Sequence, residues 1–203
     1  MLADLNQFIQ STDVILLAAG TSSRMGEENK LLLKHNNKSL IQHSIEQLQQ
    51  LPFNQIIIVT GYQDAELSKQ LNLTQAHTVT HNPEYISGQT SSIQTGLQKL
   101  ADRSKQFMIC LSDMPFLQHS HIRDLLSFTQ QQDASICRPF VKGIPGHPVI
   151  FNRSYANDLL ACEDKDGCRS VIKQHAQLLV RYESEDSAFV KDIDVQEDKG
   201  LLF

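Results

Sequence analysis

The residues best suited to chemistry lie near the start of the chain, where an apolar run leads directly into a turn rich in glycine and hydroxyl groups. Residues 14–19 are Val-Ile-Leu-Leu-Ala-Ala, residues 20–26 are Gly-Thr-Ser-Ser-Arg-Met-Gly, and Lys30 follows closely. Small residues let backbone N–H groups approach phosphate oxygens, while Arg24 and Lys30 supply the positive charge that a polyphosphate requires. The stretch therefore predicts the phosphate cradle of a nucleotide-handling enzyme.

The spacing of this stretch excludes two well-known phosphate loops. A P-loop requires Gly, four residues and then Gly-Lys-Ser/Thr, whereas five residues separate Gly20 from Gly26 and Glu27 follows. The dinucleotide fingerprint Gly-x-Gly-x-x-Gly also fails, because Ser22 stands at its second glycine. An ordinary strand-to-loop connection explains a glycine turn alone, but the string with its two cations is far more specific.

A second candidate is Asp113, which follows the apolar run 107–111 and precedes Pro115. Open α/β sheets bind ligands at the carboxyl ends of their strands, and Mg²⁺ takes one or two protein carboxylates together with phosphate oxygens and water. Asp194 is the candidate partner, although an acidic run such as 192–198 is typical of a solvated face. The residues alone leave open whether Asp113 binds a metal or only its own turn, and which carboxylate of the acidic run joins it.

Three further segments are candidates for contact with substrates. His147 lies in the Gly- and Pro-rich loop 143–149, where it can donate to an anionic substrate, orient it, or brace the turn. Residues 166–169 are Asp-Gly-Cys-Arg, and Asp166 can alternatively cap the helix that follows. Residues 88–92 open another helix, whose hydroxyls and free N–H groups meet either a ligand or each other.

These residues must be positioned by strands and helices. Along the chain, apolar runs typical of strands alternate with segments whose apolar residues recur at helical spacing. The expected strands lie near residues 13–18, 55–60, 76–80 and 106–111, and the expected helices near 39–50, 63–71, 91–101 and 120–130. After residue 130 strands and helices alternate less regularly. The expected strands there lie near 134–138, 148–151 and 178–183, and the expected helices near 153–161 and 168–175. Alternation of strand and helix predicts an α/β fold with a mainly parallel sheet.

Composition narrows the class of protein. A chain of 203 residues suits one α/β domain, and a net charge of -5 without any run of Lys or Arg argues against a nucleic-acid partner. The four cysteines are scattered without a Cys-x-x-Cys pair, which excludes a zinc knuckle or redox motif of that type: Cys110, Cys137, Cys162 and Cys168. These features favour a reduced, cytoplasmic protein.

Targeting and membrane segments are not expected. The first 23 residues contain no Lys or Arg, and Asp4 and Asp13 interrupt any apolar run, which argues against a secretory signal. No stretch approaches the ~18 apolar residues that a membrane span requires. We therefore expect no membrane partner.

In their order along most of the chain, these segments resemble the MobA-like NTP transferase family, and within it the molybdenum cofactor cytidylyltransferases. The family opening Leu-Ala-Ala-Gly-x-Ser-x-Arg-Met-Gly with a following Lys is similar to residues 17–26 and Lys30. The other matching segments are 82–83, 88–93 and 96–97 (second nucleotide segment), 112–115 (Asp-Met-Pro), 146–149 (Gly-His-Pro-Val), 166–169 (Gly-Asp-x-Gly-Ala-Arg) and 192–194 (Asp-Ile-Asp). The resemblance implies a three-layer α/β/α Rossmann-like nucleotidyltransferase fold.

The resemblance also implies an activity: Mg²⁺-dependent transfer of CMP from CTP to the terminal phosphate of a molybdopterin-type molybdenum cofactor, with release of pyrophosphate. A molybdoenzyme or its chaperone would then receive the product. The implied nucleotide-binding residues are Leu17, Ala18, Ala19, Gly20, Arg24, Lys30, Asn82, Ser92 and Asp113, of which Arg24, Lys30 and Asp113 are catalytic. The implied metal ligands are Asp113 and Asp194, and the implied acceptor-binding residues are His147, Asp166 and Gly167.

Specificity follows from small differences within the family. In the family opening Leu-Ala-Ala-Gly, the second Ala accompanies cytidylyl transfer, whereas Gly at that position accompanies guanylyl transfer. Ala19 stands at this position and therefore implies CTP. The sequence departs from the family at Thr21 and Ser23, where Arg is commoner, and at Cys168, which replaces Ala. The single domain would divide into a nucleotide-binding half, 1–115, and an acceptor-binding half, 116–203.

Two rival interpretations remain open. Enzymes that transfer a nucleotide to methylerythritol phosphate or to a sugar 1-phosphate use similar openings, although the Gly-His-Pro-Val loop disfavours them. A non-catalytic carrier of molybdenum cofactor is the other rival, and the retention of Arg24, Lys30, Asp113 and Asp194 weighs against it.

Overall fold

The computed structural model describes residues 2–21 and 29–193. Within these residues, a mixed sheet of eight strands has the order β10-β7-β9-β6-β1-β4-β5, with β8 paired to β7. Its strands are β1 (Thr12–Ala18), β4 (Gln55–Thr60), β5 (His77–His81), β6 (Gln106–Leu111), β7 (Ile136–Val141), β8 (Ile144–Pro145), β9 (Val149–Asn152) and β10 (Leu179–Ser184). The short strands β2 (Lys34–His35) and β3 (Lys38–Ser39) form a separate antiparallel pair.

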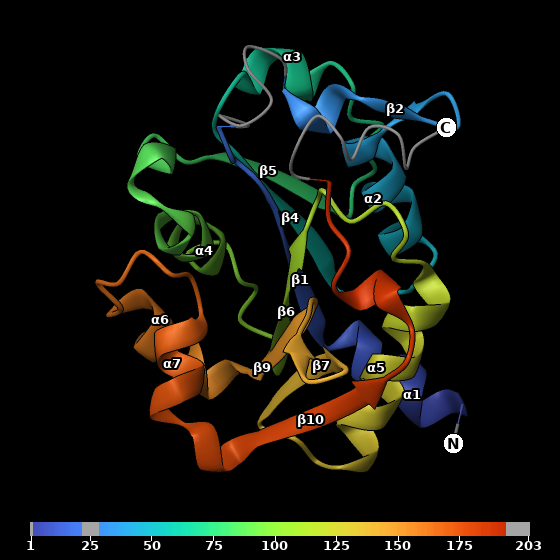
Figure 1. Ribbon diagram of the computed structural model, residues 1–203, viewed down its shortest axis with the longest axis vertical. Helices are drawn as coiled ribbons and strands as arrows, with labels where there is room; N and C mark the ends of the chain where they lie inside the picture. Colours follow the sequence, from blue (N-terminus) through green and yellow to red (C-terminus); the bar gives the residue numbers. More distant parts are fainter. Residues whose placement is uncertain (1, 22–28, 194–203) are drawn as a thin grey trace.

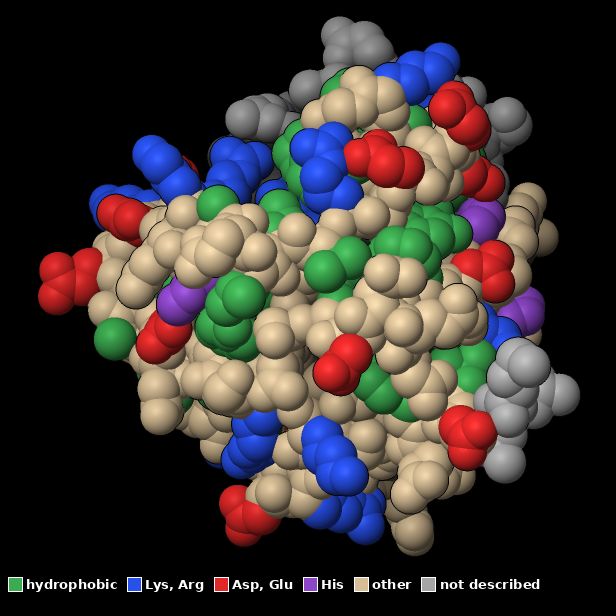
Figure 2. All heavy atoms as spheres, turned by 90° about the horizontal axis from the view of Figure 1, so that it is seen from below, with side chains coloured by type: hydrophobic (Ala, Val, Ile, Leu, Met, Phe, Trp, Pro, Cys, Tyr) green, Lys and Arg blue, Asp and Glu red, His purple; other side chains and the backbone are tan. Residues whose placement is uncertain are grey.

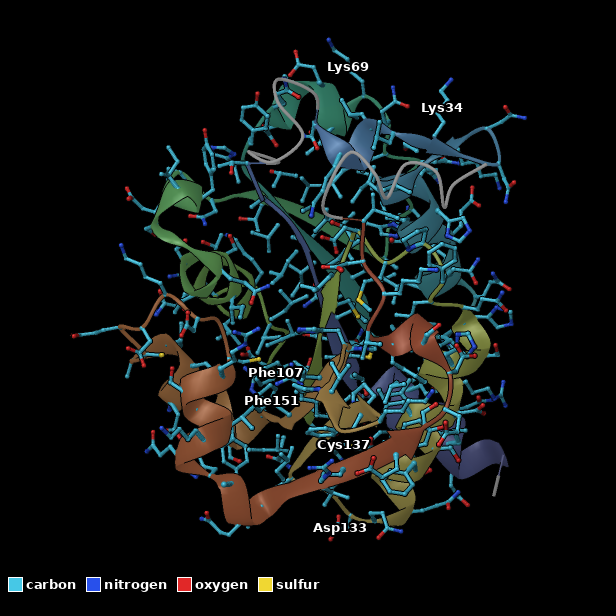
Figure 3. The ribbon with its side chains drawn as sticks, viewed as in Figure 1. Lys34, Lys69, Phe107, Asp133, Cys137 and Phe151 are labelled. Carbon is cyan, nitrogen blue, oxygen red and sulfur yellow. The ribbon has the colours of Figure 1, made fainter. Side chains whose placement is uncertain are left out.

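The sheet is mainly parallel, as the alternation of strands and helices predicts. Strands β5, β4, β1 and β6 run parallel to one another, and β10 runs parallel to β7. Strand β9 lies between β6 and β7 and is antiparallel to both. Phe107 of β6 faces Phe151 of β9 in register, and their rings stack with centroids 5.5 Å apart near the centre of the molecule (Figure 3).

Helices cover both faces of the sheet, so the predicted three-layer arrangement is confirmed (Figure 1). One face carries α1 (Leu2–Gln10), α2 (Leu40–Gln49), α3 (Asp64–Ser68) and α5 (His119–Gln131), and the other carries α4 (Gln89–Leu97), α6 (Ala156–Leu160) and α7 (Arg169–Gln174). Side chains of β1 alternate between the two cores: Val14 and Leu16 pack toward the first face, and Ile15 and Leu17 toward the second. All seven β1 residues are buried, because this strand is covered on both faces.

Helix α4 approaches the sheet closely because it presents a glycine. A Cβ atom on Gly96 would lie 2.5 Å from Cγ2 of Ile15 and 3.2 Å from Cγ2 of Val59. No side chain fits there without moving the helix. This close packing fixes the helix whose N-terminus lies beside the carboxyl end of β1.

Most predicted elements lie within two residues of their expected bounds, but some expectations are wrong. Helix α1 is not predicted at all, and the strand expected at 134–138 continues through Pro139 to Val141 and turns back into β8. The helices expected at 63–71 and 91–101 end early, at Ser68 and Leu97. Short 3-10 turns complete the described chain: Lys30–Leu32, Tyr85–Ser87, Arg153–Tyr155, Ala176–Leu178 and Ser187–Phe189.

Two observations concern the described helices and one face of the surface. None of the described helices is long and apolar enough to cross a bilayer. On the face seen from below, Lys and Arg side chains are interspersed with Asp and Glu (Figure 2). That face lies at the end of the sheet opposite the carboxyl ends of β1, β4, β5 and β6, where the predicted residues converge.

Candidate active site

A cavity of about 400 Å³ lies at the carboxyl ends of the parallel strands, where an open α/β sheet binds its ligands. It combines segments that are far apart in the sequence. Its lining residues are Leu17, Ala19, Gly20, Thr21, Lys30, Leu31, Tyr85, Ile86, Gly88, Gln89, Ser92, Leu111, Ser112, Asp113 and Asp192. The described part of the predicted cradle therefore lines a cavity, with Ala18 buried in the core beneath it.

The cradle backbone is held by a close approach at Gly61. A Cβ atom there would lie 2.8 Å from the carbonyl oxygen of Ala19 and 2.6 Å from Cβ of Tyr85. The amide of Tyr62 donates to the same Ala19 carbonyl at 3.4 Å. Only glycine lets the loop after β4 pass this close, and the result places Tyr85 at the cavity beside Ala19.

Lys30 and Asp113, which are 83 residues apart, meet in this cavity. Lys30 Nζ lies 2.6 Å from Asp113 Oδ2, with the two side chains 14% and 15% exposed. Asn29 fixes the turn that carries Lys30, because its Oδ1 accepts from the Leu31 amide at 3.0 Å and its Nδ2 donates to the Tyr62 carbonyl at 3.3 Å. Two of the three residues predicted to be catalytic are therefore in contact, whereas the third, Arg24, lies outside the described residues.

The position of Asp113 fits a cation ligand. Its Oδ1 atom is buried and has no hydrogen-bond partner among the described residues, which is uncommon for a carboxylate oxygen unless a further group binds it. The Ile193 amide donates to the Asp113 carbonyl at 2.9 Å, and Asp192 lines the cavity. Asp194 lies outside the described part, and within that part no group of three or more His, Cys, Asp or Glu residues could hold a metal. One or two carboxylates are what Mg²⁺ usually takes from a protein.

Of the two predicted nucleotide-binding residues Asn82 and Ser92, only Ser92 reaches the first cavity. Ser92 lines the cavity, whereas Asn82 is 1% exposed and lies behind it. Asn82 Nδ2 donates to the hydroxyls of Ser91 and Ser92, both at 2.9 Å, and its Oδ1 accepts from the Glu84 amide. The polar atoms of Asn82 are thus occupied by protein groups, and its side chain supports the start of α4.

A second, smaller cavity of about 200 Å³ adjoins the first, and Gln89, Leu111 and Asp192 line both. It contains two of the predicted acceptor residues, His147 and Asp166. The rest of its lining is Met114, Arg138, Pro145, Gly146, Cys168, Arg169, Phe189 and Val190. Two ligands bound in the adjoining cavities would meet at these shared residues.

Gly167 positions the wall of the second cavity rather than lining it. Its φ of +69° is in the left-handed region, and a Cβ atom would collide with the Gln89 side chain. Its amide donates to Thr90 Oγ1 at 3.0 Å, and that hydroxyl donates to the Asp164 carbonyl. The start of α4 therefore holds the loop that carries Asp166. Helix α7 begins after Cys168 without a side-chain cap, so Asp166 is not the cap.

His147 is neutral near pH 7. Its amide donates to the Phe189 carbonyl at 2.8 Å, while burial and the nearby Arg138 lower the imidazole pKa to about 4 despite a hydrogen bond with the Ile109 backbone. Among the described residues Nδ1 has no hydrogen-bond partner, so Nε2 is the nitrogen that donates a proton to the Ile109 backbone. In this tautomer the Nε2 proton is used within the protein and the buried Nδ1 is an acceptor, and the amide bond to Phe189 braces the loop.

Several residues that line these cavities are not predicted from the sequence. Tyr85 and Ile86 form an apolar wall of the first cavity, and Ser112 ties two strand ends together through a 2.6 Å hydrogen bond from its Oγ to the Leu17 carbonyl. Arg138 in the second cavity was also missed. The Tyr-Ile pair two residues before Gly88 is a local signal for the apolar wall.

Comparison with known proteins agrees with this arrangement. A sequence model of the MobA-like NTP transferase domain matches residues 14–178. The chain belongs to the MobA-like NTP transferase family. It is therefore a nucleotidyltransferase, and the matched residues include both cavities apart from the last segment of the described chain.

Individual relatives of this MobA-like family member agree in fold. The molybdenum cofactor cytidylyltransferase of Escherichia coli (strain K12) is 28% identical over 190 residues, which is 94% of each chain. Rv0371c from Mycobacterium tuberculosis has a TM-score of 0.82 at 19% identity, covering 96% of this chain and 98% of its own, and a second structure of it is a complex with manganese. A nucleotidyl transferase from Methanothermobacter thermautotroptrophicus has a TM-score of 0.79 at 18% identity, covering 92% and 93%.

Proposed function

We propose that this protein transfers CMP from CTP to the terminal phosphate of a molybdopterin-type molybdenum cofactor and releases pyrophosphate. The observation that carries the proposal is the Lys30–Asp113 pair in the first cavity, where Asp113 Oδ1 has no hydrogen-bond partner among the described residues. The similarity to the Escherichia coli molybdenum cofactor cytidylyltransferase supports molybdenum cofactor as the acceptor. Ala19, which lines the first cavity, supports CTP as the nucleotide.

The first cavity would receive the nucleotide. Its volume of about 400 Å³ falls within the range of roughly 300–1,000 Å³ usual for small-molecule sites. The backbone from Leu17 to Gly20 would bind base and phosphates, Ser92 would contribute a hydroxyl, and Arg24 and Lys30 would neutralise the triphosphate. This assigns residues 1–115 mainly to the nucleotide and 116–203 mainly to the acceptor, in keeping with the linings of the two cavities.

Asp113 and Asp194 would hold Mg²⁺, with Asp192 as the carboxylate of the same segment that lines the cavity. The bound metal would supply positive charge at the phosphate oxygens. Lys30 has three ammonium donors, so it can contact a phosphate oxygen while it remains paired with Asp113. Manganese in the Mycobacterium structure supports a divalent cation in this fold.

The reaction needs no general base in this arrangement. A phosphate monoester is already largely a dianion at neutral pH, so its oxygen can attack the α-phosphorus directly. The new P–O bond forms as the bond to the β-phosphate oxygen breaks, and pyrophosphate leaves with that electron pair. Lys30 and Arg24 would offset the charge that grows on the leaving group, while the two adjoining cavities align the reactants.

Pyrophosphate release from the purified protein tests the proposal. CTP or GTP with Mg²⁺ is combined with molybdopterin-type cofactor, methylerythritol phosphate or a sugar 1-phosphate, and chelation of the metal serves as the control. We expect release with CTP and the cofactor, and its loss on chelation. Turnover with another acceptor instead would assign the site to that acceptor, and tight cofactor binding without turnover would identify a carrier.

The product would pass to a molybdoenzyme or its chaperone. This part of the proposal is tested by mixing the protein with an apo-molybdoenzyme that requires the cytidylylated cofactor. Enzyme activity that appears only when CTP and active protein are present supports the transfer.

A further inference from the structure

Arg138 is a buried cation that the proposed mechanism does not use. It lies in β7 with only 6% exposure, and its Nε donates to the Gly146 carbonyl at 2.9 Å. An arginine has five N–H donors, so this bond leaves the other donors of the guanidinium available. The same side chain lines the second cavity. A buried charge of this kind is costly unless an anion compensates it.

The described protein provides no such anion. Burial lowers the pKa of Arg138 and the charge of Arg169 lowers it further, while the only opposing influence is the Cys168 thiol. Asp166 and Asp192 also line the cavity, but no ion pair joins either of them to Arg138 or Arg169 in the described part of the chain. Two arginines thus face one cavity, and no carboxylate of the described residues forms an ion pair with either.

The geometry around Gly146 keeps Arg138 in place. A Cβ atom on Gly146 would collide with the Phe189 carbonyl, so the loop lies directly against the segment after β10. The Gly146 carbonyl orients the guanidinium through Nε, and the next residue, His147, is fixed by the Phe189 carbonyl. The Arg138 side chain is therefore pre-organised, which reduces the entropy cost of binding a ligand.

We propose that Arg138 and Arg169 form an anion receptor that binds the phosphate monoester of the acceptor. This inference rests on the proposed function for the reaction, but the receptor itself requires only a phosphate group. Two oxygens of the phosphate would contact the guanidinium groups, and the third would face the first cavity across Gln89 and Leu111. Guanidinium groups suit this task because their planar donors match phosphate oxygens in pairs.

The first test measures anion binding without any turnover. The full-length protein carrying ¹⁵N-labelled arginine is saturated with Mg²⁺ and CTP and titrated with inorganic phosphate, while the Nε–H resonances are followed by NMR. Arg181 is the internal control, because it pairs with Arg138 in the β7–β10 register yet is exposed, bonded to Glu183 at 2.7 Å and stacked over Phe140. We expect saturable shifts at Arg138 and Arg169 and none at Arg181. Equal, non-saturating shifts at all three would overturn the receptor.

The second test separates acceptor binding from folding. Loss of a charge-assisted hydrogen bond predicts that Arg138→Met raises the KM for molybdopterin-type cofactor about 10- to 100-fold while the KM for CTP stays unchanged. Arg138→Lys should recover part of the loss, and Arg181→Met should behave as wild type. An unchanged acceptor KM, or an equal rise in both KM values, would contradict the inference.

Two safeguards keep these outcomes distinct. If Arg138→Met folds poorly, Arg169→Gln on an exposed side chain tests the same receptor with the same expected direction. If wild-type protein releases no pyrophosphate with any acceptor, the proposed function fails while the phosphate titration still decides the receptor. If turnover occurs and Arg138→Met leaves it unaltered, the receptor fails while the proposed function stands.

Discussion

The burial of His147 beside Arg138 predicts a specific loss of stability in mild acid. The folded-state pKa of about 4 is below the usual value of 6.5 that the unfolded chain has. Between these two values the unfolded chain binds more protons than the folded protein does. The free energy of unfolding therefore falls as the pH falls through this window.

The magnitude follows from the two pKa values. They differ by about 2.5, and one unit corresponds to about 1.36 kcal/mol, so the full loss is about 3 kcal/mol once the pH is below 4. At pH 5, the same linkage gives a loss of about 2 kcal/mol relative to pH 7.5. A loss of about 2 kcal/mol is roughly an eighth to two fifths of the 5–15 kcal/mol typical of a folded domain.

Urea unfolding at pH 7.5 and at pH 5.0 measures this effect. His147→Gln cannot titrate, yet its side-chain amide can still donate to the Ile109 carbonyl. The variant should lose about 2 kcal/mol less than wild type between the two pH values. His81→Gln, at an exposed position of β5, serves as the matched control and should follow wild type.

An equal pH dependence in wild type and His147→Gln would refute the reasoning. It would mean that His147 is protonated in the folded protein at pH 5, with its positive charge tolerated beside Arg138. The tautomer assigned to the second cavity would then be wrong as well.

Three further predictions concern packing, buried charge and specificity. Gly96→Ala should lower the free energy of unfolding by about 1–3 kcal/mol in urea, because the new Cβ lies 2.5 Å from Ile15 Cγ2, and an unchanged midpoint would contradict this packing. Asp13→Ala should cost about 3 kcal/mol without affecting turnover, because the buried carboxylate accepts from Asn54, Gln55 and the Ala101 amide at the opposite end of the sheet, and a loss below about 1 kcal/mol would count against it. Ala19→Gly should raise the kcat/KM ratio of GTP over CTP about tenfold, and a ratio that stays constant would remove the specificity argument.

The central strands and their order of connection are predictable because their signal is local. Strand β1 is buried on both faces, so the run from Val14 to Ala19 has no polar interruption, and helices with one apolar stripe follow each strand. Helix α1 was missed because its apolar residues, Leu5 and Ile9, gain their significance only from packing against the core. Strand β7 was cut short because Pro139 suggests a strand end, yet its carbonyl still accepts from the Gly146 amide.

The site was predictable only where its residues form compact motifs. The cradle and Asp113 stand out as strings of sequence, whereas the contact between Lys30 and Asp113 depends on folding across 83 positions. Arg138 gives no local signal, since one arginine in an apolar strand carries no spacing to interpret. Its proposed role in binding an anion follows from its burial and from the absence of an ion pair within the described residues. Both are properties of the folded protein.

The most direct test of the proposed transferase site is pyrophosphate release by Asp113→Asn. This change keeps the shape of the side chain but removes its negative charge. That charge binds Lys30 through Oδ2 and would attract a cation to Oδ1. Asp102→Asn, at a fully exposed side chain, is the matched control. We expect Asp113→Asn to fold normally and to lose about 10²-fold or more in rate, while the control keeps wild-type turnover. Near-wild-type turnover by purified Asp113→Asn would contradict the account.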